Sequence, residues 1–256
     1  MVQATAVVSG GATRHGLARI LSKLGIASRT AASAWIRAGR VQVNGRVRLD
    51  PEFPVRMDVD RIVVDDQPVQ AAARICIALN KPRGLVTTTA DERGRDTVYR
   101  CLDGARLPWL APVGRLDKAS EGLLLLSNDT QWAAAITDPD RGPDKTYHVQ
   151  VDVVPTPDLL VRLRTGVACD GQWLRAKSAE LLRHGEKQAW LEIVLDEGRN
   201  RHIRRLLAAE GVGVRRLVRV AIGPLRLGQL GKGAWRMLTP EEVTALVPSS
   251  WRVTGD

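Results

Sequence analysis

The chain has 256 residues, 44% of them hydrophobic, which excludes a wholly disordered protein because a chain of this kind can bury a sizeable core. Its formal net charge at pH 7 is +10, and arginine, which binds phosphate in bidentate geometry, dominates the cations. This balance favours a polyanionic partner. Nucleic acid ranks ahead of an anionic membrane surface, because no basic amphipathic helix with a strong aromatic face is evident.

The cysteines and histidines predict no metal site and no disulfide framework. Cys76, Cys101 and Cys169 stand far apart and form no CxxC pair, and the four histidines have no ligand spacing. No phosphate-binding glycine loop is present. No apolar run reaches transmembrane length, and the N-terminus lacks the pattern of a signal peptide. We therefore expect a cytoplasmic protein with no membrane partner.

The first part of the chain predicts a small helical unit after a flexible lead at residues 1–14. Apolar residues recur at i, i+3, i+4 and i+7 over residues 17–24, which predicts an amphipathic helix that Gly25 ends. Ser28 is a good N-cap for a second helix, which stops at Gly39.

Strands follow these helices. Residues 40–47 alternate and contain the Asn44-Gly45 hairpin turn, and residues 61–64 form a further strand before a turn. Residues 1–60 hold nine Arg and Lys against four Asp and Glu. Because the cations stand on the two helices and the hairpin, a phosphate-binding patch is favoured over a merely solvated helix face.

The segment LARILSKLGIASRTAASAWIRAGRVQVNGRV resembles the S4 RNA-binding module of ribosomal and RNA-modifying proteins. The resemblance implies an S4-like domain at residues 15–70 and an RNA partner. It makes five cations candidate RNA contacts, although any one of them can simply be solvated. They are Arg19, Lys23, Arg29, Arg37 and Arg40.

A linker at residues 70–74 leads into a second domain with many strands. We expect strands at 75–79, 85–88, 145–151, 190–195, 217–222 and 234–238. Residues 80–84 are expected in a basic turn and residues 89–108 in a loop with a short helix. Helices are expected near 132–136, at 157–164, from 201 to 210 and after the capping box that begins at Thr239.

The most informative stretch is GRLDKASEGLLLLSND, residues 114–129. Leu123 to Leu126 reads as a strand buried on both faces, and Asp117 lies just before it among the cations Arg115 and Lys118. A carboxylate in that position suits a nucleophile or an acid/base group. From residue types alone, an ion pair with Arg115 or Lys118, or a turn cap, is the favoured explanation of Asp117, and the rest of the chain reverses that order.

Downstream, EGRNRHIRRLLAAEG places several arginines at the start of a helix that follows a strand. Ile203, Leu206 and Leu207 define its apolar face, and Arg204 and Arg205 lie on the face beside it. Arginines at a helix N-terminus predict an anion site.

Four blocks of the second domain, LNKPRGLVTT, GRLDKASEGLLLLSND, KTYHVQV and EGRNRHIRRL, occur in one order. In that order they resemble the pseudouridine synthases that act on ribosomal RNA, in the branch that carries an S4 module. The resemblance implies an α+β chain. A small S4-like domain precedes a mixed, largely antiparallel β-sheet catalytic domain with flanking helices, at residues 75–250.

The resemblance implies that a uridine within RNA is detached from its ribose, turned and rejoined through carbon. Substrate and product are isomers, so no cofactor or metal is required. Asp117 would be the nucleophile, Arg204 the arginine that orients it, and Tyr147 an active-site tyrosine that stacks near the base. Without the motif, Tyr147 could be a core residue and Arg204 a solvated one. The candidate RNA contacts in this domain are Lys81, Arg83, Arg115, Arg199, Arg201 and Arg205. Lys81 and Arg83 can equally well be simply solvated.

A uridine inside folded RNA must be flipped out before an aspartate in a cleft can reach its glycosidic bond. The expected partner is ribosomal RNA or a pre-ribosomal particle, with a lean toward the large subunit, and we expect a monomer. The competing hypothesis is a non-catalytic RNA-binding or ribosome-assembly protein of the same fold; a DNA-binding protein ranks third. The sequence leaves open which uridine is modified.

Overall fold

The computed structural model describes residues 14–89, 91 and 93–247, and it divides into two compact units between Ala73 and Arg74. The division falls within the expected linker at residues 70–74. Most of the predicted lead at residues 1–14, and residues 248–250 of the predicted catalytic domain, lie outside the described residues. In the described part of the chain, no helix combines the length and the apolar character needed to cross a membrane.

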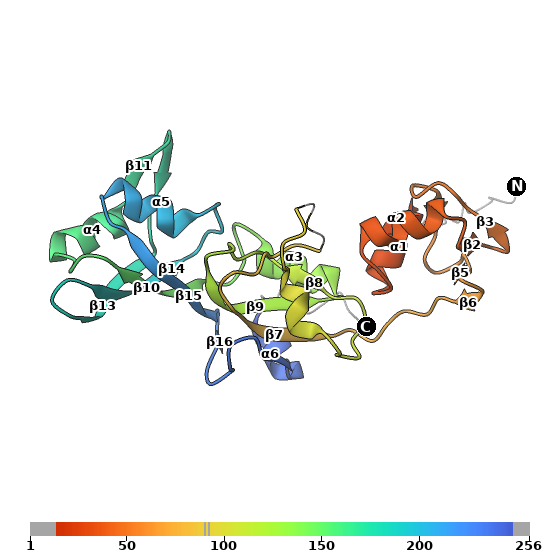
Figure 1. Ribbon diagram of the computed structural model, residues 1–256. Helices are drawn as coiled ribbons and strands as arrows, with labels where there is room; N and C mark the ends of the chain where they lie inside the picture. The colour runs from red at the N-terminus through yellow and green to blue at the C-terminus, as the bar shows by residue number, and fades with distance from the viewer. Residues whose placement is uncertain (1–13, 90, 92, 248–256) are drawn as a thin grey trace, which may run out of the picture. The chain divides into compact units, whose positions relative to one another are not determined.

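The first unit combines two short helices with small antiparallel sheets (Figure 1). Its elements are β1 (His15–Gly16), α1 (Leu17–Lys23), α2 (Arg29–Arg37), β2 (Val41–Val43), β3 (Arg46–Val47), β4 (Pro54–Val55), β5 (Ile62–Val64) and β6 (Gln67–Pro68). The four-stranded sheet has the order β3-β2-β5-β6, and β1 pairs with β4 alone.

Local sequence signals explain these boundaries. The Ser28 side chain caps α2 by accepting a hydrogen bond from the Ala31 backbone N–H at 3.0 Å. Asn44 and Gly45 have φ angles of 53° and 76°, the left-handed geometry that a two-residue hairpin turn between β2 and β3 requires. The helices and the hairpin expected here are therefore confirmed.

The second unit is built on a nine-stranded sheet. Its elements are β7 (Cys76–Lys81), η1 (Val98–Leu102), β8 (Ala111–Val113), β9 (Glu121–Ser127), α3 (Thr130–Thr137), β10 (Lys145–Val151), α4 (Pro157–Thr165), β11 (Val167–Cys169), β12 (Gln172–Leu174), β13 (Ser178–His184), β14 (Ala189–Leu195), α5 (His202–Ala209), β15 (Val214–Ile222), β16 (Leu225–Arg226), β17 (Trp235–Met237) and α6 (Pro240–Ala245). The sheet runs β13-β14-β10-β15-β9-β7-β17, with β16 on β15 and β8 on β9. The β9–β15 pair is parallel and the other pairs are antiparallel, which confirms the predicted fold class.

Apolar cores lie on both sides of this sheet. Figure 1 shows α4 and α5 on the same side of β10, β14 and β15, and their apolar residues form one core with these strands. Strand β9 is buried along its whole length, as expected. Leu123 and Leu125 pack into the core that includes α3, and Leu124 and Leu126 pack into the core that includes η1. The strand that follows the GRLD motif is thus enclosed from both faces.

Two predictions for the segment before the GRLD motif differ from the structure. The sequence predicts a basic turn at residues 80–84, but β7 continues through Asn80 and Lys81, and the turn is confined to Arg83 and Gly84. Residues 85–88 form no strand; a single β-bridge joins Val86 to Thr97. The polar groups of this segment bond instead to the loop that carries Asp117.

Candidate active site

Asp117 lies in the loop between β8 and β9, and the segment after β7 holds this loop in place. The Thr87 hydroxyl donates to the Leu116 carbonyl at 2.7 Å and accepts a hydrogen bond from the Leu116 N–H at 3.3 Å. The Gly84 N–H donates to the Lys118 carbonyl at 2.8 Å. The backbone on both sides of the carboxylate is therefore fixed by hydrogen bonds.

The Lys81 side chain also holds the Asp117 loop, through hydrogen bonds to its backbone carbonyls. Its ammonium group donates to the carbonyls of Pro82, Asp117 and Ser120 at 3.1, 3.2 and 2.8 Å. Burial lowers the pKa of Lys81 to about 8, although the charge of Asp117 acts to raise it. The prediction that Lys81 contacts RNA is wrong, because its side chain is 0% exposed and all three of its protons have acceptors.

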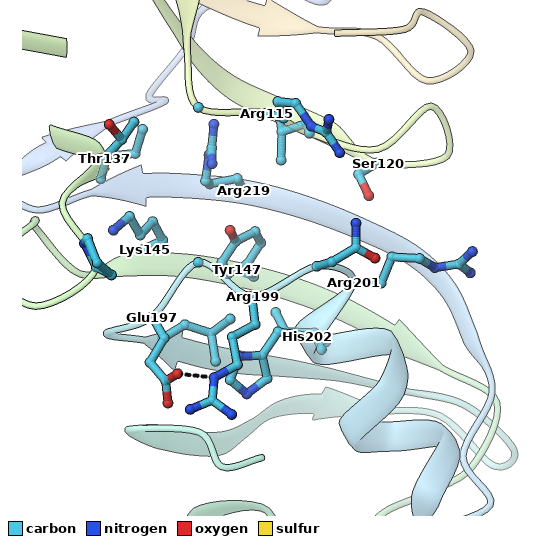
Figure 2. Close-up of a pocket in the computed structure, with 18 of the residues that line it drawn as sticks. Arg115, Ser120, Thr137, Lys145, Tyr147, Glu197, Arg199, Arg201, His202 and Arg219 are labelled. Atoms are coloured by element: carbon cyan, nitrogen blue, oxygen red, sulfur yellow. Dashed lines mark hydrogen bonds and ion pairs between the residues drawn. The ribbon is translucent and has the colours of Figure 1, made fainter. Parts of the chain in front are cut away.

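A cavity of about 880 Å³ opens in front of the Asp117 loop (Figure 2). Asp117 and Tyr147 both line it, so the structure brings together two of the three predicted catalytic residues. Tyr147 stands on β10, opposite Ile193 of β14 and Arg219 of β15. The volume lies in the range of about 300–1,000 Å³ that is typical of small-molecule sites.

Arg204, the third predicted catalytic residue, reaches the Asp117 loop from α5. Its Nη2 donates to the Ala119 carbonyl at 3.3 Å, and its Nη1 donates to the Val214 carbonyl at 3.4 Å. Burial lowers the pKa of the Arg204 guanidinium, and the charge of Asp117 acts to raise it. The two groups therefore interact through their charges, although no ion pair joins them in the described part of the chain.

Further basic side chains line the wall of the cavity. Lys145 and His202 lie inside the quoted motifs but were not predicted as site residues, and Arg219 lies outside the motifs. Burial lowers the pKa of Lys145, and the charge of Arg219 lowers it further. His202 is 3% exposed, and burial lowers its pKa, which favours the neutral imidazole. Arg219 is 5% exposed and donates its Nε to the Leu123 carbonyl at 2.7 Å. A basic residue inside the apolar strand at 217–222 was the only sequence signal for Arg219.

Exposed arginines surround the mouth of the cavity. Arg115, Arg199 and Arg201 line it, and Figure 2 shows the ion pair between Arg199 and Glu197. Arg83 is exposed, and its charge lowers the pKa of Arg204, which places it near the same loop. These arginines remain candidate RNA contacts.

Two other candidate RNA contacts are engaged within the protein. Arg205 donates to the Gln172 side chain at 3.1 Å and lies 3.4 Å from Asp170, so it braces the β11–β12 hairpin. Arg40 forms an ion pair with Asp65, its Nε donating at 2.8 Å. Each pairing reduces the charge that the arginine can offer to a phosphate.

The remaining candidates of the first unit are more accessible. Arg19, Arg29 and Arg37 are exposed on α1 and α2. Lys23 is half-buried, and its Nζ lies 3.2 Å from the His15 ring. The cations of this unit thus remain candidates of unequal availability.

The three cysteines are free. Among the described residues, no group of three or more His, Cys, Asp and Glu side chains is placed to hold a metal ion.

Two known sequence families match the chain. The RNA pseudouridylate synthase family matches residues 75–209, and the S4 domain matches residues 16–60. The chain belongs to the RNA pseudouridylate synthase family. Asp117, Tyr147 and Arg204 all fall inside the segment that matches this family, and the match confirms the resemblance seen in the sequence.

Similar proteins extend over nearly the whole chain. An uncharacterized RNA pseudouridine synthase of Mycobacterium tuberculosis is 39% identical over 241 residues, which cover 90% of this chain and 92% of that protein. Ribosomal large subunit pseudouridine synthase B of Bacillus subtilis is 35% identical over 233 residues, covering 90% of this chain and 94% of that protein. Each of these alignments includes both units of this chain.

A solved structure supports the same conclusion. The crystal structure of a pseudouridylate synthase aligns with a TM-score of 0.63 and 30% identity, covering 92% of this chain and all of that chain. The protein is therefore an RNA pseudouridine synthase, an isomerase, with an S4 domain at its N-terminal end.

Proposed function

We propose that this protein converts uridine to pseudouridine in ribosomal RNA, with Asp117 as the nucleophile. The observation that carries the assignment of the site is that Asp117 and Tyr147 line one cavity while Arg204 contacts the Asp117 loop. The uridine would enter this cavity, so that its glycosidic bond meets the carboxylate.

Asp117, Tyr147 and Arg204 can each act in the isomerisation. The Asp117 carboxylate attacks C1′ of the ribose, and the electron pair of the C1′–N1 bond leaves with the uracil. The base then turns, C5 rejoins C1′, the carboxylate is released, and the hydrogen on C5 is replaced by one on N1. The Tyr147 ring holds the base by stacking. Arg204 orients the carboxylate through its charge.

The surrounding charge supports binding of a flipped nucleotide. Unstacking a base costs a few kcal/mol, which phosphate contacts from Arg115, Arg199 and Arg201 would offset. The S4 domain supplies a second, tethered contact, which raises the effective concentration of RNA at the cavity. The basic composition of the whole chain fits this use.

We propose that the substrate is large-subunit ribosomal RNA and that the protein acts as a monomer in the cytoplasm. The support for the subunit is that Bacillus subtilis and Pseudomonas aeruginosa relatives at 35% and 33% identity are each named ribosomal large subunit pseudouridine synthase B. Mapping pseudouridine in ribosomal RNA from cells that lack the gene would identify the subunit and the position; loss of a small-subunit site alone would contradict this proposal.

The test of the nucleophile compares Asp117→Asn with Asp140→Asn, a control that alters an exposed carboxylate of the same cavity. Each protein is incubated with uridine-containing ribosomal RNA, and pseudouridine is measured after nuclease digestion. We expect the Asp117 variant to lose at least about 1,000-fold in rate and the control to stay within about three-fold. Equal RNA binding with full activity in the Asp117 variant would remove Asp117 from the mechanism.

A further inference from the structure

Arg219 is a buried cation of the active-site cavity to which the proposed steps give no role. It is 5% exposed and lines the cavity, and Figure 2 shows it on β15 between Tyr147 and Arg115. Its Nε donates to the Leu123 carbonyl, but its Nη2 is buried and has no hydrogen-bond partner among the described residues. A buried guanidinium proton without an acceptor is costly, so native proteins retain one mainly where function requires it.

The strand pairing fixes the position of Arg219 in the sheet. β15 pairs in parallel with β9, and Arg219 is opposite Gly122. Gly122 belongs to the start of β9, the strand that follows the Asp117 loop. A Cβ atom at Gly122 would lie 2.3 Å from the Arg219 carbonyl oxygen, so only glycine permits this close approach. On its other side Arg219 is opposite Tyr147. The backbone of Arg219 thus lies between β9 and β10, and the hydrogen bond from Nε to the Leu123 carbonyl holds the guanidinium toward β9.

The carboxylates of the cavity do not neutralise Arg219. Glu197 is paired with Arg199, and the Asp138 carboxylate accepts hydrogen bonds from the backbone N–H groups of Asp140 and Arg141. No ion pair to Arg219 is formed within the described part of the chain. The second cation on this wall, Lys145, has its pKa lowered by burial and by Arg219. This wall therefore offers positive charge to whatever enters the cavity.

The depth of Arg219 identifies the part of the substrate that meets it. A flipped nucleotide keeps its phosphate on the RNA backbone and inserts its base most deeply. The exposed Arg115, Arg199 and Arg201 are placed for phosphate, whereas Arg219 is almost fully buried beside the tyrosine on which the base stacks. The acceptors that a uracil presents there are its carbonyl oxygens.

We propose that Arg219 is a catalytic residue that donates a hydrogen bond from its guanidinium group to a carbonyl oxygen of the flipped uracil. When the C1′–N1 bond breaks and its electron pair passes to the base, the negative charge spreads onto the carbonyl oxygens. A preorganised guanidinium then binds the departing base more tightly than it binds neutral uridine, which accelerates the step. This role rests on the proposed function, because it requires a flipped uridine in the cavity.

The first test measures single-turnover rates and RNA dissociation constants for Arg219→Gln and Arg219→Lys on an RNA that the wild-type protein modifies. The control is Arg215→Gln, an exposed arginine of the same strand. We expect Arg219→Gln to react about 100- to 1,000-fold more slowly at saturating RNA, with RNA affinity within about three-fold of wild type. Arg219→Lys should recover part of the rate, and the control should match wild type.

The second test pairs each protein with RNA in which the target uridine is replaced by 2-thiouridine or 4-thiouridine. Sulfur is a weaker acceptor than oxygen, so one of these analogues should slow the wild-type protein but slow Arg219→Gln no further. If Arg219→Gln does not fold, the same comparison is made with Arg219→Lys, for which the effect of that analogue should be smaller than for wild type.

Two results would overturn the role of Arg219. One is a full single-turnover rate at saturating RNA in the variants, with weakened binding alone, which would make Arg219 a phosphate contact. The other is that each analogue slows the variant by the same factor as it slows the wild-type protein. Since every comparison begins from an RNA that the wild-type protein modifies, these results would leave the proposed function intact, whereas failure to modify any ribosomal RNA would count against that function.

Discussion

Replacing Lys81 by methionine tests whether a buried ammonium group positions the catalytic loop. Lys81 holds the carbonyls of Asp117, Ser120 and Pro82, and methionine fills similar space without donating a hydrogen bond. The Asp117 loop would then lose the hydrogen bonds that the Lys81 side chain donates to it. The Asp117 carboxylate would sample positions away from C1′ of the ribose. A misplacement of about 1 Å can cost about 100-fold in rate.

The structure predicts a small effect of this change on stability. Burial lowers the pKa of Lys81 from 10.5 to about 8, so keeping the charge in the folded protein at pH 7 costs about 3 kcal/mol. Methionine removes that cost but leaves the Ser120 carbonyl, which is buried, without this donor, a loss of about 1–3 kcal/mol. The two terms nearly cancel. We expect the free energy of unfolding to change by less than about 2 kcal/mol while kcat falls about 100-fold.

The pH dependence follows from the same pKa. Between pH 8 and 10.5 the unfolded chain binds a proton at Lys81 that the folded chain has released, so this group makes the protein more stable as pH rises. Over the same range kcat should fall, because the neutral amine has one proton fewer for three carbonyls. In Lys81→Met both effects should disappear.

The assay measures kcat from about pH 6 to about pH 9.5 and unfolding in urea, with Lys118→Met as the control, since Lys118 is an exposed lysine of the same loop. The control should keep kcat within about three-fold of wild type. The reasoning is refuted if Lys81→Met keeps wild-type kcat at neutral pH, or if its loss of kcat matches a loss of folded protein.

Two further changes test the strand that follows the catalytic loop. Gly122→Ala should lower the free energy of unfolding by about 3 kcal/mol or more in urea titrations, because φ is +100° and the added Cβ meets the Arg219 backbone at 2.3 Å; a change below about 1 kcal/mol would show that the β9–β15 pair can shift. Glu121→Gln should destabilise the protein at neutral pH. Burial raises the pKa of the Glu121 carboxyl, but hydrogen bonds and charge from Arg216 and Lys232 outweigh burial and lower it. The stabilising contribution of the Glu121 carboxylate is therefore present above pH 4.5 and lost as pH falls through the lowered pKa. The unfolding free energies of wild type and variant should therefore converge in acid.

The elements of the fold were predictable where one local signal decided them. The Ser28 cap, the Asn44-Gly45 turn and the all-apolar run before Ser127 each correspond to an observed feature. The site was predictable only through motifs. The β11–β12 hairpin was missed because its strands have only three residues each, and β13 was missed because it carries Glu180 and Arg183 among its apolar residues. Such segments become strands only through their neighbours.

Lys81 and Arg219 show why the rest of the site could not be read from the sequence. From residue type alone, both residues are expected to be solvated cations of a basic protein. Lys81 is buried because β7 continues two residues beyond its apolar run, and three backbone carbonyls replace water around its ammonium group. Arg219 is buried because β9 approaches it through a glycine. Both environments are tertiary, and no local pattern encodes them.

The distribution of the cations leads to a final expectation about salt. Arg115, Arg199 and Arg201 line the open mouth of the cavity, so dissolved ions compete with them for phosphate, and each phosphate that they bind steepens the fall of RNA affinity with salt. Lys81, Arg204 and Arg219 are buried or half-buried near Asp117, where ions screen their charges much less. Raising salt from about 50 to about 200 mM should therefore increase KM at least about ten-fold while kcat at saturating RNA changes less than about two-fold. A parallel fall in kcat would mean that the cations around the nucleophile are open to solvent during the reaction, and the separation between phosphate-binding and catalytic arginines would then be wrong.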